Sequence, residues 1–279
     1  MKKKILITGA QGLIGSVLLE KIVEENNFQI FSIIQPSSQL KFNDVVYLEH
    51  DLLNPLPEKK IPNDLDYVIH MAAIAHGENM GSIMFKNCLM TKNLIDAVKH
   101  LNPVFIFFSS ISVYGEANRT FPIKNTTICK PSSYYGKGKL IDENNIKTNF
   151  KDYKILRLCP MVDDINNKDF LKRVFLPKFK IKYKSPYERI YSFSSHSSIF
   201  NNVNQLLNSV NSDPITINLK DEVDLNEKNI LSNFDGSSFK FPKLILDIIF
   251  IFLNFFSFNS YIYHINCSFW KMFRINTYE

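Results

Sequence analysis

The chain predicts an α/β fold: a doubly wound parallel sheet with a smaller C-terminal lobe. Three observations predict it. Short apolar runs alternate with amphipathic segments as far as about residue 158, a glycine-rich turn follows the first run, and only one of the nine glycines lies beyond Gly138. Strands that alternate with helices form parallel sheets, because each helix carries the chain back across the sheet. At 279 residues the chain can bury one large core and a smaller second one.

The first element is the apolar run Lys4–Thr8, which we expect to be a buried strand, and an amphipathic helix is expected over residues 13–26. The turn between them reads Gly9-Ala10-Gln11-Gly12-Leu13-Ile14-Gly15, a G-x-x-G-x-x-G spacing. In a strand, turn and helix context, such glycines let the backbone approach a pyrophosphate, which then meets the helix N-terminus. An ordinary tight turn is the alternative interpretation of the three glycines taken alone.

The remaining elements continue the alternation. Apolar runs predict further strands at residues 30–34, 45–49, 67–70, 104–109 and 154–158. Longer periodic segments predict two more helices, at residues 82–100 and 134–148. In a sheet of this kind the ligand binds at the carboxyl ends of the strands. The functional residues are therefore expected directly after these strands.

Charge and cysteine usage narrow the class of protein. The net charge of +6 suits an anionic small substrate or a membrane surface, and no nucleic-acid motif accompanies it, so we expect no nucleic-acid partner. The four cysteines have neither metal-ligand nor paired spacing, which predicts reduced thiols, no metal site and a cytoplasmic protein. Lys2-Lys3-Lys4 precedes only a few apolar residues before Gly9, so we expect no signal peptide.

A tyrosine and a lysine four residues apart, Tyr135 and Lys139, carry the strongest chemical signal. Residues at i and i+4 lie on one face of a helix, so the ammonium would lie beside the phenol and favour the phenolate. A serine supplied by the end of a separate strand, within Ser109-Ser110-Ile111-Ser112, would hydrogen-bond the same substrate oxygen. Together they would form a general acid and base for a sugar or alcohol hydroxyl. A surface helical pair is the alternative interpretation of Tyr135 and Lys139.

With both motifs in this order, the chain resembles the extended short-chain dehydrogenase/reductase family, the NAD-dependent epimerase/dehydratase group. The resemblance is strong over residues 1–160 and weak beyond them. It implies a Rossmann-like NAD(P)-binding domain at residues 1–160 and a substrate lobe at residues 161–279, with a soft boundary between them. It makes Ser110, three residues before Val113-Tyr114-Gly115, the catalytic serine beside Tyr135 and Lys139, with Ser109 and Ser112 as alternatives.

The resemblance also implies a set of cofactor-binding positions. They lie in the glycine turn and at the ends of strands, at Gly9, Gln11, Gly12, Leu13, Ile14, Gly15, Gln35, Asp51, Leu52, Met71, Ala72, Ala73, Asn87, Tyr135, Lys139 and Pro160. Asp51 stands where the family places an Asp near the adenine, and Asn87 matches the Asn of an N-x-x-x-T-x-N-L pattern.

The choice between NAD and NADP is weakly encoded. The second strand ends Ile33-Ile34-Gln35-Pro36-Ser37-Ser38. An acidic residue there would hold the ribose 2′-hydroxyl of NAD, and an arginine would hold the 2′-phosphate of NADP. Gln35 does neither, and the two serines would donate to either cofactor or form a simple turn. We expect NAD or NADP, with a slight preference for NAD.

The resemblance implies an enzyme that acts on an activated sugar, nucleotide-linked or lipid-linked, in surface-polysaccharide biosynthesis. In the family scheme Tyr135 removes the proton from a hydroxyl, usually at C4, NAD⁺ takes the hydride, and reduction from the other face gives an epimer. Lys139 would hold the nicotinamide ribose, and Ser110 would steady the developing oxyanion. The alternatives are an NAD(P)H-dependent 4-keto-sugar reductase and, disfavoured by the complete set of three residues, a non-catalytic dinucleotide-binding protein. We expect a homodimer.

The second lobe departs from the family pattern. Pro160 stands where the family has an Asn that touches the substrate diphosphate, and Tyr191 replaces an Arg. Ser197-Ser198 replaces an acidic pair. Because of these departures, the sequence supports a nucleotide-linked substrate less strongly than it supports the acid–base chemistry of Tyr135, Lys139 and Ser110. Arg189 is a candidate to replace the missing Arg, although an exposed Arg is more often a solvated surface residue. His196 is either a ligand contact or, more often for such a residue, a hydrogen-bonded structural histidine.

The segment Leu244–Phe258 is extremely apolar but shorter than the roughly 20 residues of a membrane span, and it contains Asp247 and Asn254. We expect a helix with a very wide apolar face. The preferred interpretation packs this helix into the substrate lobe or a dimer interface. The alternative is peripheral contact with a membrane through residues 240–274.

Overall fold

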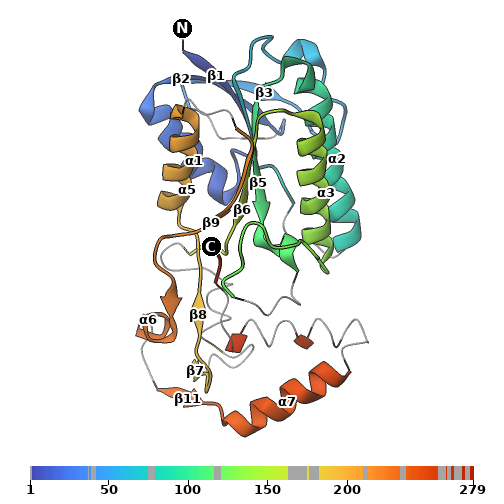
Figure 1. The fold of residues 1–279 in the computed structure, drawn as a ribbon. Helices are drawn as coiled ribbons and strands as arrows, with labels where there is room; N and C mark the ends of the chain where they lie inside the picture. Colours follow the sequence, from blue (N-terminus) through green and yellow to red (C-terminus); the bar gives the residue numbers. More distant parts are fainter. Residues whose placement is uncertain are drawn as a thin grey trace. The chain divides into compact units, whose positions relative to one another are not determined.

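A computed structural model of the chain describes residues 2–36, 38, 42–74, 79–115, 121–162, 175, 182–209, 213–232, 237–256, 262, 265–266, 272–273 and 277–279 (Figure 1). The chain forms two compact units. The first comprises Met1–Gly115, Thr126–Leu158 and His196–Leu219, and the second comprises Glu116–Asn125, Cys159–Ser195 and Lys220–Glu279. The chain therefore re-enters the first unit through His196–Leu219, and the division into domains at residue 160 stays a prediction.

A seven-stranded parallel sheet forms the first unit, with the strand order β3-β2-β1-β4-β5-β6-β9. Its strands are β1 (Lys3–Thr8), β2 (Phe28–Ile34), β3 (Val45–Glu49), β4 (Tyr67–His70), β5 (Val104–Ser110), β6 (Tyr153–Leu158) and β9 (Ile215–Leu219). The order reverses next to β1, so the carboxyl ends of β1 and β4 lie at the topological switch point where such sheets bind their ligands.

Helices cover both faces of this sheet (Figure 1). On one face lie α1 (Leu13–Glu25) and α5 (His196–Asn208), and on the other lie α2 (Met80–Val98) and α3 (Tyr134–Asn149). The central strands are buried on both faces, and Ile5, Ile69 and Phe107 are fully enclosed. This burial explains why the strands read as nearly continuous apolar runs.

The predicted doubly wound fold is confirmed. Each of the six expected strands and three expected helices is present, with ends within two residues of the predicted ones. Of the strands and α-helices described in the first unit, β9 and α5 were not predicted.

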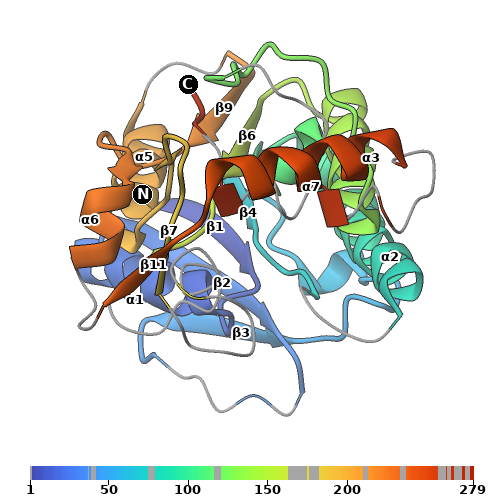
Figure 2. The same cartoon turned by 90° about the horizontal axis from the view of Figure 1, so that it is seen from below.

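The second unit contains two small sheets and an apolar helix. The antiparallel pair is β8 (Ile190–Tyr191) with β10 (Leu225–Asn226), and the parallel pair is β7 (Lys182–Lys184) with β11 (Ser238–Lys240). The helices are α6 (Glu227–Ser232) and α7 (Lys243–Phe255), and α7 continues directly from β11 (Figure 2). Within the described part of the chain, no helix is long and apolar enough to cross a membrane.

Candidate active site

The glycine turn between β1 and α1 uses its three glycines in different ways. Gly9 has a φ of +76°, and a Cβ there would lie 2.5 Å from the amide nitrogen of Ala72. A Cβ on Gly15 would lie 2.1 Å from the carbonyl oxygen of Gly9. Gly12 has a φ of −76°, and its Cβ would meet that same oxygen at 3.3 Å, with no other described atom nearby. The turn itself therefore requires Gly9 and Gly15, whereas a Cβ on Gly12 would make only one tight contact, with the Gly9 carbonyl.

The N-terminus of α1 lacks any side-chain cap and carries no acidic residue in its first turn. Its first N–H groups have no intrahelical partner, and with the helix dipole they make a positive end that favours an anion. Gln11 and Leu13 are exposed beside this end, and Ile14 is half-buried. These observations fit a pyrophosphate-containing cofactor held by the turn.

Two contacts fix the end of β4 against the glycine turn. The amide of Met71 donates to the carbonyl of Thr8 at 3.1 Å, and the amide of Ala72 donates to the Thr8 hydroxyl at 3.4 Å. The side chain of Asn87 holds the residues that follow, because its amide group bonds both the N–H of Ile74 (2.8 Å) and its carbonyl (3.0 Å). Met71, Ala72 and the exposed Ala73 are therefore held next to the turn.

The structure gives less support for cofactor contact at the other expected positions. Asp51 accepts the amide of Leu53 at 3.0 Å in a local turn, and Leu52 is buried. Gln35 is exposed after β2, and Ser37 lies outside the described residues. Pro160 belongs to the second unit, where its carbonyl accepts the amide of Ser194 at 3.0 Å. Cofactor contact by these residues stays a prediction.

Tyr135 and Lys139 lie one turn apart at the start of α3 and are held against the end of β5. The buried Lys139 ammonium donates to the carbonyl of Phe108 at 2.8 Å and lies 5.9 Å from the centre of the Tyr135 ring. A Cβ on Gly136 would lie 2.5 Å from the carbonyl oxygen of Ser112, so the first turn of α3 packs directly on the short helix that follows β5.

Three serines at the end of β5 separate into two groups. Ser109 donates its hydroxyl to the buried carboxylate of Glu143 at 2.6 Å. The Ser110 hydroxyl instead accepts the amide of Ser112 and donates to its hydroxyl, each at 3.2 Å. Ser110 and Ser112 thus form a hydroxyl pair beside the start of α3, while Ser109 is engaged in the interior.

A buried polar chain that the sequence analysis missed runs behind this site. His70 is fully buried between two threonines, with its Nδ1 2.6 Å from the Thr8 hydroxyl and its Nε2 3.0 Å from the Thr91 hydroxyl. Burial, and next the charge of Lys139, lowers the pKa of His70 to about 3, so the imidazole is neutral. The single Thr91 hydroxyl proton is directed to the carbonyl of Asn87 or to Asp142, so in either case the Thr91 oxygen accepts from Nε2–H, which leaves Nδ1 to accept from Thr8.

The chain continues from Thr91 to Asp142, one turn beyond Lys139 on α3. The Asp142 carboxyl is 1 % exposed, and Thr91 and Cys88 hydrogen-bond it, although its Oδ1 has no partner among the described atoms. Burial raises the pKa of Asp142 to about 6, against the opposing charge of Lys139. Among the described residues, no group of three or more His, Cys, Asp and Glu side chains could hold a metal ion.

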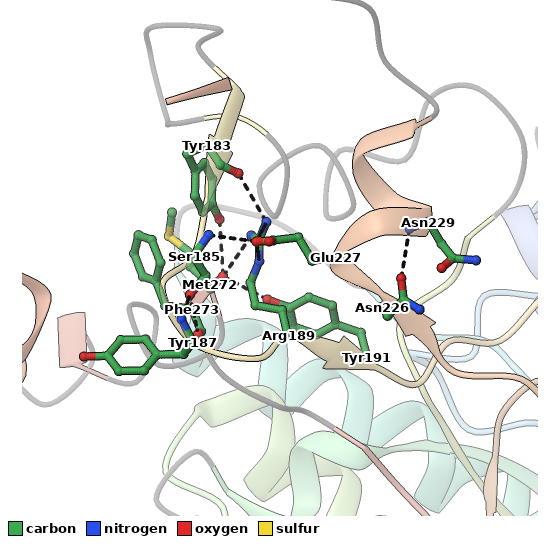
Figure 3. A network of polar contacts seen from close by, with 10 residues as sticks. All are labelled: Tyr183, Ser185, Tyr187, Arg189, Tyr191, Asn226, Glu227, Asn229, Met272 and Phe273. Carbon is green, nitrogen blue, oxygen red and sulfur yellow. Dashed lines mark hydrogen bonds and ion pairs between the residues drawn. The ribbon is translucent and has the colours of Figure 1, made fainter. Parts of the chain in front are cut away.

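Two candidates from the second lobe have structural partners instead. The guanidinium of Arg189 is fully buried, pairs with Glu227 at 2.7 Å, and donates to the carbonyls of Tyr183 and Met272 (Figure 3). Tyr191 donates its hydroxyl to the Met272 carbonyl at 2.8 Å. The idea that Arg189 is a solvated surface residue was wrong, and the ion pair leaves it poorly suited to bind a substrate diphosphate.

His196 begins α5 in the first unit, and its Nε2 lies 3.0 Å from the carbonyl oxygen of Leu13 at the start of α1. The imidazole therefore ties two helices of the same sheet face together. This contact agrees with the structural interpretation of His196 rather than with a ligand contact.

Comparison with known proteins assigns the chain to a family. The model of the NAD dependent epimerase/dehydratase family matches residues 5–183, more than half of the 279 residues. The chain belongs to this family. The match covers the glycine turn, the strand ends and the pair Tyr135 and Lys139.

Named relatives of this epimerase/dehydratase family member carry several activities. D-erythronate dehydrogenase of Haemophilus influenzae is 30% identical over 152 residues, 50% of this chain and 48% of the relative. An uncharacterized UDP-glucose epimerase of Bacillus subtilis, YtcB, is 29% identical over 161 residues, 50% of this chain and 49% of the relative. The aligned part of the chain thus spans about half the length of these relatives.

A solved structure shares the fold over most of the chain. UDP-glucuronic acid 4-epimerase from Bacillus cereus, in complex with NAD, has a TM-score of 0.66 at 22% identity. The similarity covers 85% of this chain and 87% of that one. It extends well past the segment that the sequence relatives match.

Proposed function

We propose that the protein is an NAD-dependent enzyme that epimerises a nucleotide-linked sugar at C4 by transient oxidation. The observation that carries this proposal is the position of Tyr135 and Lys139 at the start of α3, which the Lys139 to Phe108 bond holds against the end of β5, the strand that ends at Ser110. The YtcB relative is named for UDP-glucose, and the Bacillus cereus enzyme was solved with NAD, which supports this substrate class and cofactor.

The residues of the first unit fit NAD. The turn around Gly12 and the uncapped start of α1 would hold the pyrophosphate, and Met71–Ala73 would line the adjacent part of the cofactor. An ammonium has three N–H donors, and Lys139 gives one to Phe108, so the others can reach the nicotinamide ribose and Tyr135. Bound NAD would supply the hydride acceptor and then the hydride donor.

The protein's own groups then manage one proton. Tyr135 as phenolate would accept the proton of the sugar hydroxyl, and as phenol it would return it. The Lys139 ammonium would stabilise the phenolate, and the Ser110 hydroxyl would donate to the substrate oxygen as negative charge develops there. The same three groups would serve both halves of the reaction.

The substrate proposal has two further parts. The ion pair of Arg189 with Glu227 makes us propose that other groups contact the phosphates of the sugar donor. A nucleotide-linked sugar remains our first choice over a lipid-linked one, because the named epimerase relatives carry UDP-sugar names. We place the product in surface-polysaccharide synthesis, as a proposal that a gene-deletion phenotype would test.

One-way hydride transfer is a second candidate, favoured by the dehydrogenase name of the Haemophilus influenzae relative. A 4-keto-sugar reductase would use the same tyrosine as an acid and consume NAD(P)H. The cofactor separates the two. An epimerase holds NAD⁺ tightly and regenerates it in every catalytic cycle, so that no cofactor is consumed. A reductase oxidises one NAD(P)H for each product molecule.

The test of the proposed site is Tyr135→Phe. Phe keeps the ring and removes the hydroxyl that carries the proton, so turnover on a panel of UDP-sugars should fall by about 10²–10⁴-fold. NAD affinity, measured by calorimetric titration, should stay unchanged. Tyr134→Phe is the matched control, because Tyr134 is the preceding residue and is 54% exposed. Full activity in Tyr135→Phe would remove the assignment.

A further inference from the structure

The helix α7 presents apolar side chains on opposite sides. Leu246, Phe250 and Leu253 recur at i, i+4 and i+7 and are buried, and the first two pack in a cluster of the second unit with Tyr183 and Phe273. The opposite side carries an equally regular stripe with exposed fractions of 50 to 74%, at Leu244, Ile245, Ile248, Ile251, Phe252 and Phe255. A surface helix normally presents polar residues there.

The exposed stripe cannot be hidden by rotating α7. Leu246 is fully buried, and the hydroxyl of Tyr187 hydrogen-bonds the carboxylate of Asp247, so the present inner face is well anchored. Turning the helix over would expose Leu246, Phe250 and Leu253 instead. The predicted packing of this helix into the lobe therefore applies to its inner face only. Its outer face remains exposed in the monomer and would be covered only by another apolar surface or medium.

Lysines lie at the N-terminal end of the same helix. Lys240 ends β11, Lys243 begins α7, and Lys184 pairs with Lys240 across the two-stranded sheet, with all three exposed. A cavity of about 450 Å³ beside this sheet is lined by Lys182, Lys184 and Lys228 together with Ser232, Ser237 and Ser238. Glu227 also lines it, but its charge is already paired with Arg189 (Figure 3).

We propose that α7 lies in the surface of an anionic membrane, with its outer apolar face among the acyl chains. In this arrangement Lys184, Lys240 and Lys243 meet lipid phosphates, and the lysine-lined cavity accepts a headgroup. A helix of 13 residues is about 20 Å long, which suits a position in the plane of the interface and is too short to span. The proposal does not depend on the sugar chemistry proposed above.

Charge decides between a lipid surface and a second copy of the chain. A second copy would cover the apolar stripe, but it would bring the same lysines in a chain of net charge +6. An anionic membrane offers an apolar phase and negative phosphates side by side. It therefore complements both features of the surface at once.

Vesicle flotation of the full chain tests the proposal. Protein should float with phosphatidylglycerol/phosphatidylcholine vesicles, float less at high salt, and stay largely unbound with phosphatidylcholine alone. Ile248→Gln/Ile251→Gln should weaken binding by about tenfold or more, because both side chains leave the acyl region. The matched control is Ile128→Gln/Val223→Gln, at two residues that are each 74% exposed elsewhere, and it should bind like the wild type.

A second variant isolates the charges. Lys240→Gln/Lys243→Gln should lower binding to anionic vesicles by about tenfold and remove much of its salt dependence. Hydrogen exchange of the wild-type chain, which needs no variant, should show protection of residues 243–255 upon addition of anionic vesicles.

Three results would overturn the proposal: no flotation of the wild type, wild-type binding by the Ile248→Gln/Ile251→Gln variant, or unchanged exchange in α7. Light scattering without vesicles tests the alternative, in which a second copy of the chain covers the outer face of α7. A dimer that depends on Ile248 and Ile251, in a protein that ignores vesicles, would assign the face to a second copy. Loss of UDP-sugar turnover would bear only on the proposed function.

Discussion

At the scale of single residues, the glycine turn separates fold from ligand binding. Gly15 and Gly9 are required by backbone contacts within the first unit, whereas the Cβ of a residue at position 12 would make one tight contact, at 3.3 Å from the Gly9 carbonyl oxygen. We predict that Gly12→Val folds normally and binds NAD at least about tenfold more weakly, because the side chain fills the space before α1. Calorimetric titration measures the affinity.

Two further glycine variants control this prediction. Gly81→Ala, in α2, meets its nearest atom at an ordinary 3.5 Å, so it should leave the NAD affinity unchanged and raise helix stability slightly. Gly15→Ala should lower the stability of the fold itself, because its Cβ would overlap the Gly9 carbonyl. Unchanged NAD affinity in a folded Gly12→Val protein would mean that the turn has a structural role only.

Asp142 gives a prediction about pH. Its folded pKa of about 6 lies above the ordinary value of 3.8 for an Asp carboxyl, so the folded state binds more protons than the unfolded state between these values. Stability is therefore lost as pH rises through this window, and the full cost is present above it. Asp142→Asn removes the titration and should stabilise the protein by about 2–3 kcal/mol at pH 8, with the difference vanishing below about pH 4.

Denaturant unfolding at several pH values measures this difference, and comparison with the wild type cancels the opposite contribution of His70. Asp96→Asn is the control of opposite sign. Lys92, and next Lys99, hydrogen-bond the Asp96 carboxylate and lower its pKa, so that variant should lose a little stability at neutral pH. An Asp142→Asn protein less stable than the wild type at pH 8 would mean that the charge pairing with Lys139 outweighs burial.

At the scale of elements, the strongly patterned segments were predictable and the weakly patterned ones were not. The central strands are buried on both faces, so their apolar runs stand out. The missed strand β9 is an edge strand that reads Ile-Thr-Ile-Asn-Leu. The missed helix α5 reads His-Ser-Ser-Ile-Phe-Asn-Asn-Val-Asn-Gln-Leu-Leu-Asn, and serine and asparagine favour caps and turns. Its three buried residues, Ile199, Val203 and Leu207, fix it on the sheet.

A buried ion pair joins α3 to β6. Arg157 donates to Glu143 at 3.0 and 2.7 Å and to the Tyr114 hydroxyl at 2.9 Å. Arg157→Leu leaves the Glu143 carboxylate buried without this partner, which should cost about 3–5 kcal/mol of unfolding free energy. Lys147, 3.8 Å from the carboxylate and partly exposed, offsets only part of the loss.

The double variant Arg157→Leu/Glu143→Leu should be more stable than Arg157→Leu alone, because neither charge is then left unpaired. Asp64→Asn is the surface control. Its carboxylate side chain, which pairs with Lys4, is 68% exposed, so the loss should be below about 1 kcal/mol. Urea denaturation measures all three variants. An Arg157→Leu protein that unfolds like the wild type would show that Ser109 and Lys147 suffice to hold Glu143.

At the scale of the whole molecule, the parts of the candidate site that are close in sequence were predictable, and the contacts between residues far apart in sequence were not. Tyr135 and Lys139 are four residues apart, so a helix alone places them together. Thr8 and His70 meet across 62 residues, and their pairing follows only from the adjacency of β1 and β4 in the sheet. The sequence alone does not reveal such contacts. For the same reason it does not reveal that Arg189 forms an ion pair with Glu227 in the second unit.

The two proposals also separate at this scale, because they concern different units. NAD should slow hydrogen exchange around residues 9–15, 71–74 and 135–140, since a ligand that binds only the folded site adds to its stability. At 100 times the dissociation constant the slowing should reach about 100-fold, and residues 243–255 should be unaffected.

Anionic vesicles should give the reverse pattern, with protection of residues 243–255 and no change at the glycine turn. Either result can fail while the other holds, because residues 9–15, 71–74 and 135–140 belong to one compact unit and the residues of α7 to the other. Protection of α7 by NAD alone would contradict that independence, since coupling would require the two sites to share a conformational equilibrium.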